Sequence, residues 1–151
     1  SARAISRRSL SEILTTRPVV TTFLEHDGKI LLLRRSETVR TYPGRWAAVS
    51  GSIDSGHTPE QQARVEINEE TQLTDADVRL LVSGEPLEFH DADIGHGWIV
   101  HPFRFSVRSP ERIKLNWENV EFRWIDPHDL NGYETVPRLT EVWERVAPRD
   151  T

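Results

Sequence analysis

The most informative stretch of the sequence is GSIDSGHTPEQQARVEINEETQL, residues 51–73. A glycine-bracketed loop opens it, and its second part is predicted to be a helix that runs to about Thr71. Thr58 is a good N-cap, Pro59 suits the first helical position, and Gln61 completes a capping box. Few positions of this helix are apolar, which indicates a helix that faces solvent or lines a charged site.

Three glutamates share one face of the predicted helix: Glu66, Glu69 and Glu70 stand at positions i, i+3 and i+4. Like charges at this spacing repel by about 0.2–0.5 kcal/mol per pair. No basic residue stands at helical spacing on either side of them to relieve the repulsion. A hard divalent cation such as Mg²⁺ would turn the repulsion into binding, because Mg²⁺ takes carboxylates together with substrate phosphates. The alternative is a solvated acidic face.

Together with its loop, the stretch resembles the signature of the Nudix hydrolases, G-x5-E-x7-R-E-U-x-E-E-x-G-U, in which U is apolar. The matching residues are Gly51, Glu66, Ile67, Glu69, Glu70 and Leu73. Three positions depart from the signature: His57 replaces its first glutamate, Val65 its arginine and Gln72 its glycine. The order of the predicted elements resembles the family over about residues 19–125.

The resemblance implies an α/β (α+β) fold, an α/β/α sandwich around a mixed β-sheet. It also implies metal-dependent hydrolysis of a phosphoanhydride, such as a nucleoside diphosphate linked to another group or a related pyrophosphate compound. The implied cofactor is Mg²⁺ or Mn²⁺, because an acidic protein binds a pyrophosphate only through bridging cations. The second interpretation is a catalytically weak Nudix domain that binds a nucleotide or a phosphorylated metabolite as a sensor.

The resemblance also assigns residues to the site. The implied metal ligands are Glu66, Glu69 and Glu70. The candidates for a catalytic carboxylate are Glu69, Glu118 and Glu121. Arginine makes forked contacts with phosphate oxygens, and the substrate-binding candidates are Arg35, Arg45 and Gly51. Three box positions have no assigned role: His57, Arg64 and Val65. In the family, the arginine of the signature orients a catalytic glutamate. Arg64 could replace this missing arginine only from about 100° farther round the helix.

The composition of the 151-residue chain excludes several other functions. A net charge of −5 argues against general nucleic-acid binding, since such domains are usually basic. No run approaches the ~20 apolar residues of a transmembrane helix, so no membrane partner is expected. The absence of cysteine excludes a disulfide scaffold and a thiolate site. It also argues against the isopentenyl diphosphate isomerase branch of the family, which uses a cysteine. The expected partner is a nucleotide-type small molecule, and a homodimer is left open.

The length predicts one domain. Residues 1–17 carry four arginines against one acidic residue. This composition is typical of a tail and also of an organelle transit peptide. We therefore predict an N-terminal extension over residues 1–17 and a Nudix domain over residues 18–151, with a cytoplasmic location unless the extension directs organelle import.

The other elements are predicted from β-branched and apolar runs. Strands are expected over residues 18–24, 29–33, 46–49, 78–82, 98–105 and 120–125, and a last helix over residues 136–146. The pair Asp27–Gly28 predicts a hairpin turn. Pro102 lacks an N–H group, which predicts an edge or bulged position for its strand. Phe89 and Trp98 are predicted either to stack on a base or to belong to the core.

Overall fold

The computed structural model describes residues 16–149, so most of the predicted N-terminal extension lies outside the described residues. Within them, eight strands form one sheet: β1 (Thr16–His26), β2 (Lys29–Arg35), β3 (Trp46–Ala47), β4 (Val49–Ser52), β5 (Val78–Ser83), β6 (Leu87–Asp91), β7 (His96–Val107) and β8 (Asn119–Ile125). The helices are α2 (Pro59–Thr71), α3 (Leu139–Glu144) and the short 3₁₀ turns η1 (Pro110–Arg112) and η2 (Pro127–Gly132).

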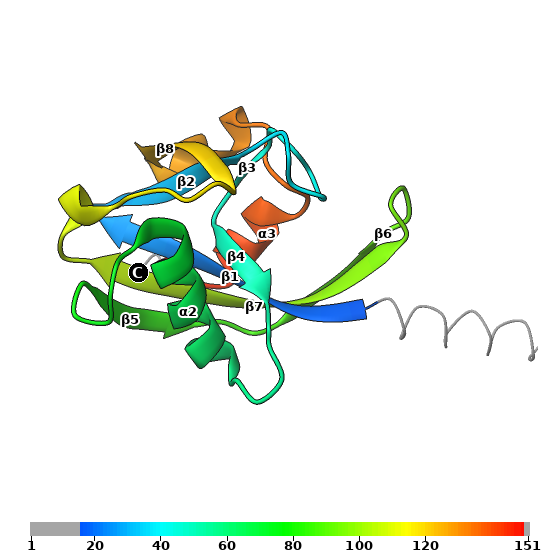
Figure 1. The fold of residues 1–151 in the computed structure, drawn as a ribbon, viewed down its shortest axis with the longest axis horizontal. Helices are drawn as coiled ribbons and strands as arrows, with labels where there is room; N and C mark the ends of the chain where they lie inside the picture. The colour runs from blue at the N-terminus through cyan, green and yellow to red at the C-terminus, as the bar shows by residue number, and fades with distance from the viewer. Residues whose placement is uncertain (1–15, 150–151) are drawn as a thin grey trace, which may run out of the picture.

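The sheet is mixed, as predicted. Its order is β3-β2-β1-β7-β5, with β4 paired to β1, β6 to β7 and β8 to β2. Strands β1 and β7 run parallel, and the other pairs are antiparallel. The middle of β1, at residues 19–22, pairs with β4, and the end of β1 pairs with β2. Because β4 leads directly into the loop before α2, this pairing fixes the loop against the centre of the sheet (Figure 1).

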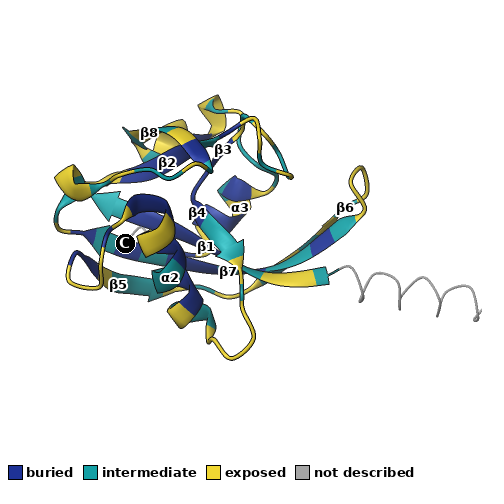
Figure 2. Cartoon of the chain, in the orientation of Figure 1, coloured by how far each residue is buried: buried dark blue, intermediate teal, exposed yellow. Residues whose placement is uncertain are grey.

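Helices cover both faces of the sheet, which confirms the predicted sandwich. Leu31 and Leu33 of β2 pack in the core beneath α2, and Ile30 and Leu32 pack on the other face with Trp143 of α3. Strand β2 is therefore buried on both faces. Figure 2 shows the buried residues in the central strands and the exposed ones in the loop before α2 and at the tip of the β6–β7 hairpin.

Of the two positions predicted for the strand of Pro102, an edge or a bulge, the edge is wrong. The irregular register in its pairing with β5 falls between Leu80 and Val82. Strand β7 is central, with β1 on one side and both β5 and β6 on the other. Pro102 falls between the two partners on that side, because β5 pairs up to Phe103 and β6 pairs from Val100. Its missing N–H therefore breaks no ladder bond there, while its carbonyl accepts from the N–H of Gly84 at 2.9 Å.

Other elements differ in extent from the predictions. The strand expected over residues 46–49 is divided into β3 and β4, and β4 continues into the box loop. Helix α3 is shorter than the predicted helix over residues 136–146. The hairpin at Asp27–Gly28 is confirmed, with positive φ at both residues as a two-residue hairpin turn requires. No helix in residues 16–149 is long and apolar enough to cross a membrane.

Candidate active site

Helix α2 turns two of the three glutamates of the signature, Glu66 and Glu70, toward the sheet. Glu66 is 9% exposed and Glu70 is 3% exposed, whereas Glu69 is exposed. A buried carboxylate normally has a cationic partner, because burial strongly disfavours its charge. Within residues 16–149, however, neither Glu66 nor Glu70 forms an ion pair with a basic side chain. The inner face of α2 therefore holds two buried carboxyl groups that have no direct ion pair among the described residues.

Neutral donors hold the two buried carboxylates in place. Glu70 accepts at one oxygen from Asn119 Nδ2 and at the other from the N–H of Ser50, both at 3.2 Å. Glu66 accepts from the Nε2 of Gln62 at 3.2 Å. These donors orient the carboxylates without balancing their charge, so the electrostatic strain between them remains.

Glu118 adds a third negative charge from the loop before β8. Burial is the first cause that raises the pKa of Glu70 well above its usual range, and the charges of Glu118 and Glu66 follow. Burial, then the charge of Glu69, raises the pKa of Glu66 to about 7. Glu118 is half-buried and contributes to both shifts. The structure thus brings Glu118 to the acidic face of α2.

Gly51 lets β4 approach Glu66 closely. A Cβ atom at this position would overlap the Glu66 carboxyl group and would lie 2.8 Å from its Cγ. Separations below 3.0 Å are essentially never found for real Cβ atoms. A side chain at this position would force the Glu66 carboxyl group to move, because the backbone of β4 lies directly against this predicted metal ligand.

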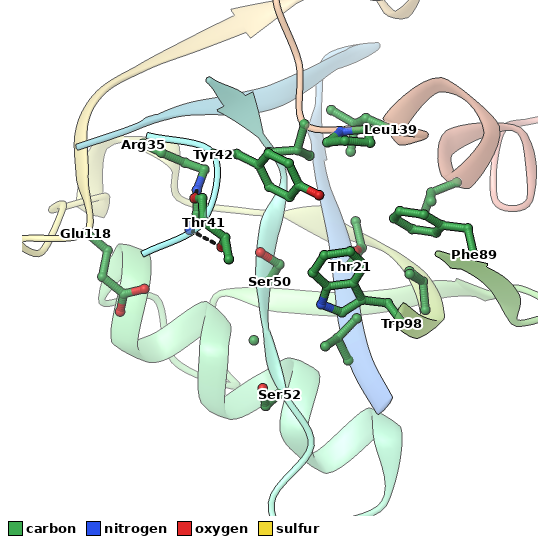
Figure 3. A pocket seen from close by; sticks show the side chains of 16 residues that line it. Thr21, Arg35, Thr41, Tyr42, Ser50, Ser52, Phe89, Trp98, Glu118 and Leu139 are labelled. Carbon is green, nitrogen blue, oxygen red and sulfur yellow. Dashed lines mark hydrogen bonds between the residues drawn. The ribbon is translucent and has the colours of Figure 1, made fainter. Parts of the chain in front are cut away.

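A cavity of about 230 Å³ opens beside Ser50 and Gly51. Figure 3 shows Arg35 and Glu118 at one end of it. Thr41 holds the Arg35 guanidinium through its backbone oxygen on Nε at 2.9 Å and its hydroxyl on Nη2 at 3.2 Å. Burial lowers the pKa of Arg35, while Glu70 and Glu118 act in the opposite direction. This end of the cavity is polar and contains charges of both signs.

The other end of the cavity is aromatic (Figure 3). Trp98 lies 5.3 Å from Phe89 and 6.0 Å from Tyr42 between ring centroids. The hydroxyl of Tyr42 donates to Asp91 Oδ2 at 2.6 Å, which joins the loop before β3 to β6. Tyr42 has a φ of 50°, a strained value for a bulky residue, and such strain is concentrated at functional sites.

Several predicted residues lie apart from this cavity. Glu121 faces the opposite side of β8 and pairs with Arg34 at 2.6 Å and with Arg123 at 3.8 Å. Arg45 is exposed and donates to the Thr135 carbonyl at 3.3 Å. The structure therefore brings Arg35, Gly51 and Glu118 together with the glutamates of α2, and it does not bring Arg45 or Glu121 there.

Of the three box positions without an assigned role, His57 lies in the loop before α2, and Arg64 and Val65 lie on α2. Arg64 pairs with Glu60 and Asp75 at 3.2 Å and stacks on Phe105, so its guanidinium is engaged away from Glu66. Half-buried Val65 and exposed His57 line a hollow of about 590 Å³ together with Glu69. Gln72 has the left-handed φ of 64° that the family's glycine would adopt more easily.

Sequence reasoning missed three residues that hold the carboxylates: Ser50, Gln62 and Asn119. Gln62 stands four positions before Glu66, a spacing that places the two side chains together on a helix. The sequence carries no such signal for Asn119, which reaches Glu70 only through the pairing of β8 with β2.

The donor set fits a hard divalent cation. Carboxylates are the side-chain ligands that Mg²⁺ prefers, and two of them here are buried without a counter-ion. In the part of the chain that the structure describes, no three acidic or histidine side chains converge closely enough to form a finished coordination sphere. Cation binding would therefore require side-chain rotation, which the exposed Glu69 and half-buried Glu118 can undergo.

The sequence profile of the NUDIX domain matches residues 15–146. The chain belongs to the Nudix family. Nudix hydrolases cleave pyrophosphate-type bonds in small nucleotide substrates, and they generally need a divalent cation, typically Mg²⁺. The family resemblance read from residues 51–73 is therefore confirmed.

This Nudix chain resembles several proteins of known name over most of its length. The nucleoside triphosphatase NudI of Escherichia coli (strain SE11) is 25% identical over 123 residues, which are 78% of this chain and 87% of that protein. A MutT protein from Methanosarcina mazei Go1 has a TM-score of 0.73 at 26% identity, over 86% of this chain and 91% of that chain. A Nudix hydrolase from Nitrosomonas europaea has a TM-score of 0.71 at 21% identity, over 86% of this chain and 87% of that chain, and shows the fold alone.

The metal-free protein is expected to melt at a lower temperature at pH 8 than at pH 5.5. The folded state keeps a proton on Glu66 up to about pH 7, whereas the usual carboxyl pKa is 4.5. Between these values the folded state binds more protons than the unfolded state, so the free energy of unfolding falls as pH rises. Thermal melts with a chelator measure this difference. Glu70 also has a raised pKa, so Glu66→Gln removes one of two contributing groups and is expected to reduce the pH dependence. An unchanged dependence in this variant would contradict the contribution of Glu66.

Proposed function

We propose that this chain hydrolyses a phosphoanhydride bond of a nucleotide, with Mg²⁺ or Mn²⁺ as its cofactor. One observation carries the proposal. Buried Glu66 and Glu70 have no basic partner among the described residues, and they lie directly behind the cavity wall formed by Ser50 and Gly51. An anionic pyrophosphate and a cation bound together would neutralise this site.

The acidic residues would hold the cation. Glu66 and Glu70 are the proposed ligands, with Glu69 reaching the same ion from the outer side of α2. When bound, the cation lowers the pKa of a water molecule and neutralises the charge that develops on the phosphoryl oxygens. Glu118 is the carboxylate best placed to accept the proton of that water, because it lies at the cavity rather than behind it.

The cavity would bind the two parts of a nucleotide at its two ends. Arg35 is the proposed phosphate contact, because Thr41 fixes the plane of its guanidinium at the cavity wall. Trp98 and Tyr42 are the proposed contacts for the base, since base–aromatic stacking contributes about 1–3 kcal/mol. The name of the NudI relatives makes nucleoside triphosphates the first substrates to test.

A panel of phosphoanhydrides tests this function. Purified protein is incubated with nucleoside triphosphates, dinucleoside polyphosphates and nucleoside diphosphates linked to sugars, with Mg²⁺, with Mn²⁺ and with a chelator. We expect cleavage of at least one compound only when metal is present, with phosphorylated products separated by chromatography. If no compound is cleaved with either metal while nucleotides still bind, the alternative of a binding module, which the departures at His57 and Val65 favour, replaces this proposal.

The same assay separates the two predicted carboxylates near β8. Glu118→Gln is expected to lower kcat by about 10²–10⁴-fold, the usual contribution of a general base. Glu121→Gln breaks the ion pair with Arg34 on the other face of the sheet and is expected to leave kcat within about threefold. Comparable losses in both variants would contradict the assignment of this role to Glu118.

A further inference from the structure

The side-chain amide of Gln62 connects the box loop to the buried carboxylate of Glu66. Gln62 is 2% exposed. Its Oε1 accepts from the backbone N–H of Asp54 at 3.0 Å and lies 2.7 Å from His57 Nδ1. Its Nε2 donates to Glu66 Oε2 at 3.2 Å. One buried amide thus contacts the loop backbone, the histidine and the glutamate.

These contacts fix the orientation of the amide. The Asp54 N–H can only donate, and the Glu66 carboxylate accepts. A rotated amide would place its NH₂ against the Asp54 N–H and its oxygen against the Glu66 oxygen, which are two repulsive contacts in place of two hydrogen bonds. The oxygen of Gln62 therefore faces the loop, and this orientation follows from chemistry and not only from the atomic positions.

The orientation of Gln62 in turn determines the tautomer of His57. An amide oxygen has no proton to give, so His57 Nδ1 must carry the proton in their 2.7 Å hydrogen bond. The neutral imidazole is then left with a lone pair on Nε2. His57 and Glu69 both line the hollow of about 590 Å³ beside α2.

Neither position 65 nor Arg64 supplies an arginine that could orient the Glu66 carboxylate. Position 65, where the Nudix signature has its arginine, is a valine with no polar atom in its side chain. Arg64 is held by Glu60 and Asp75. In the described residues, Gln62 is the side chain that links position 57 of the loop to the acidic face of α2.

We propose that Gln62 is a positioning residue that replaces the missing arginine of the box. It orients the Glu66 carboxylate, and it holds His57 as the Nδ1–H tautomer so that Nε2 is presented as an acceptor. This proposal rests on the proposed hydrolase function for its kinetic consequence, but its prediction for His57 does not depend on catalysis.

The tautomer is measured first, on the metal-free wild-type protein. The ¹⁵N chemical shifts of the histidine rings distinguish Nδ1–H from Nε2–H, and His57→Ala identifies the signals of this exposed residue. We expect a protonated Nδ1 and an unprotonated Nε2 on neutral His57. The Nε2–H tautomer in the wild type would overturn the proposal whether or not the protein hydrolyses any substrate.

Two variants of Gln62 separate its two contacts. Gln62→Met keeps the approximate volume and removes the amide, so His57 should lose its fixed tautomer. Gln62→Glu keeps an acceptor toward Asp54 and His57 but cannot donate to Glu66, so the tautomer should persist. In both variants kcat should fall by about 10–100-fold with KM within about threefold, because a carboxylate misplaced by about 1 Å costs about 10²-fold. Glu60→Gln, on the same helix at a half-buried position, loosens Arg64 without changing the amide of Gln62. It is the control and should match the wild type.

The readouts distinguish failure of this proposal from failure of the proposed function. Wild-type activity combined with unchanged kcat in Gln62→Met would overturn the positioning role and leave the hydrolase function standing. Absence of activity in the wild type would overturn the hydrolase function, and the ¹⁵N shifts with a Mn²⁺ titration of Gln62→Met would still decide the positioning role. Equal Mn²⁺ affinity and an unchanged tautomer in Gln62→Met would overturn it. Thermal melts confirm that each variant is folded.

Discussion

Replacing Glu70 with Gln is expected to lower kcat by about 10²–10³-fold and to weaken Mn²⁺ binding measured by calorimetry. A metal ligand supports several kcal/mol of charge stabilisation in the transition state, and each 1.36 kcal/mol corresponds to a factor of ten in rate. Glu70 is 3% exposed, and Ser50 and Asn119 each donate a hydrogen bond to its carboxylate. The carboxylate is therefore fixed in one position.

The same substitution is expected to stabilise the metal-free protein. Burial and the charges of Glu118 and Glu66 hold the pKa of Glu70 well above its usual range, which means that the ionised group is unfavourable in the fold. An amide removes this cost and raises Tm at pH 8. Glu144→Gln, on the exposed side of α3, is the matched control and should change neither Mn²⁺ affinity nor kcat. Equal Mn²⁺ binding by the wild type and Glu70→Gln would remove Glu70 from the site.

Helix α2 could be predicted from sequence because its determinants are local. The capping box is present in both directions, with the N–H of Thr58 donating to Gln61 Oε1 at 2.8 Å and the N–H of Gln61 donating to Thr58 Oγ1 at 3.2 Å. The helical spacing of the glutamates was equally local. It did not indicate which of them would be buried, because that depends on where the sheet lies against the helix.

The rest of the site depends on pairings between distant segments. In the register of β2 with β8, Arg34 lies opposite Glu121, and Phe122 lies opposite Leu33. Leu33 belongs to the core beneath α2, so Phe122 is on the α2 side of the sheet. Successive residues of a strand face opposite sides, so this register turns Glu121 away from α2. A shift of one residue would have reversed the outcome. No periodicity within either segment reveals the register, which is why the sequence left both Glu118 and Glu121 as candidates.

The cavity could not be predicted from the sequence either, because distant segments form its walls. Its walls come from β1, β2, β4, the loop before β3, the β6–β7 hairpin and the segment around α3. Trp98 could be predicted as a base-stacking or a core residue, and the structure places it at the cavity wall. Tyr42 carried no signal in the sequence, because its place beside Trp98 depends on its bond to Asp91 and on an unusual backbone conformation.

Gly51→Ala is expected to abolish most of the hydrolysis while leaving the fold largely intact. The φ of Gly51 is not in the left-handed region, so alanine can adopt the backbone conformation there. Its Cβ, however, would overlap the Glu66 carboxyl group and force it to move. Glu66 cannot move far, because its side chain is buried and bonded to Gln62. We expect a loss of at least about 10²-fold in kcat and weaker Mn²⁺ binding.

Gly84→Ala is the matched control, because it makes a comparable overlap in a different place. Its Cβ would lie 2.7 Å from the Arg145 carbonyl oxygen and 2.9 Å from Val146 Cγ1, at the end of α3. That overlap strains the packing of α3 against the sheet, so we expect a lower Tm, by several degrees, and an unchanged kcat of the folded protein at a temperature well below its Tm. Gly51→Ala is therefore expected to lose activity and keep its stability, whereas Gly84→Ala is expected to lose stability and keep its activity. If Gly51→Ala kept both turnover and Mn²⁺ affinity, the Glu66 carboxyl would have rotated aside without consequence, and Glu66 would not be a ligand of the metal.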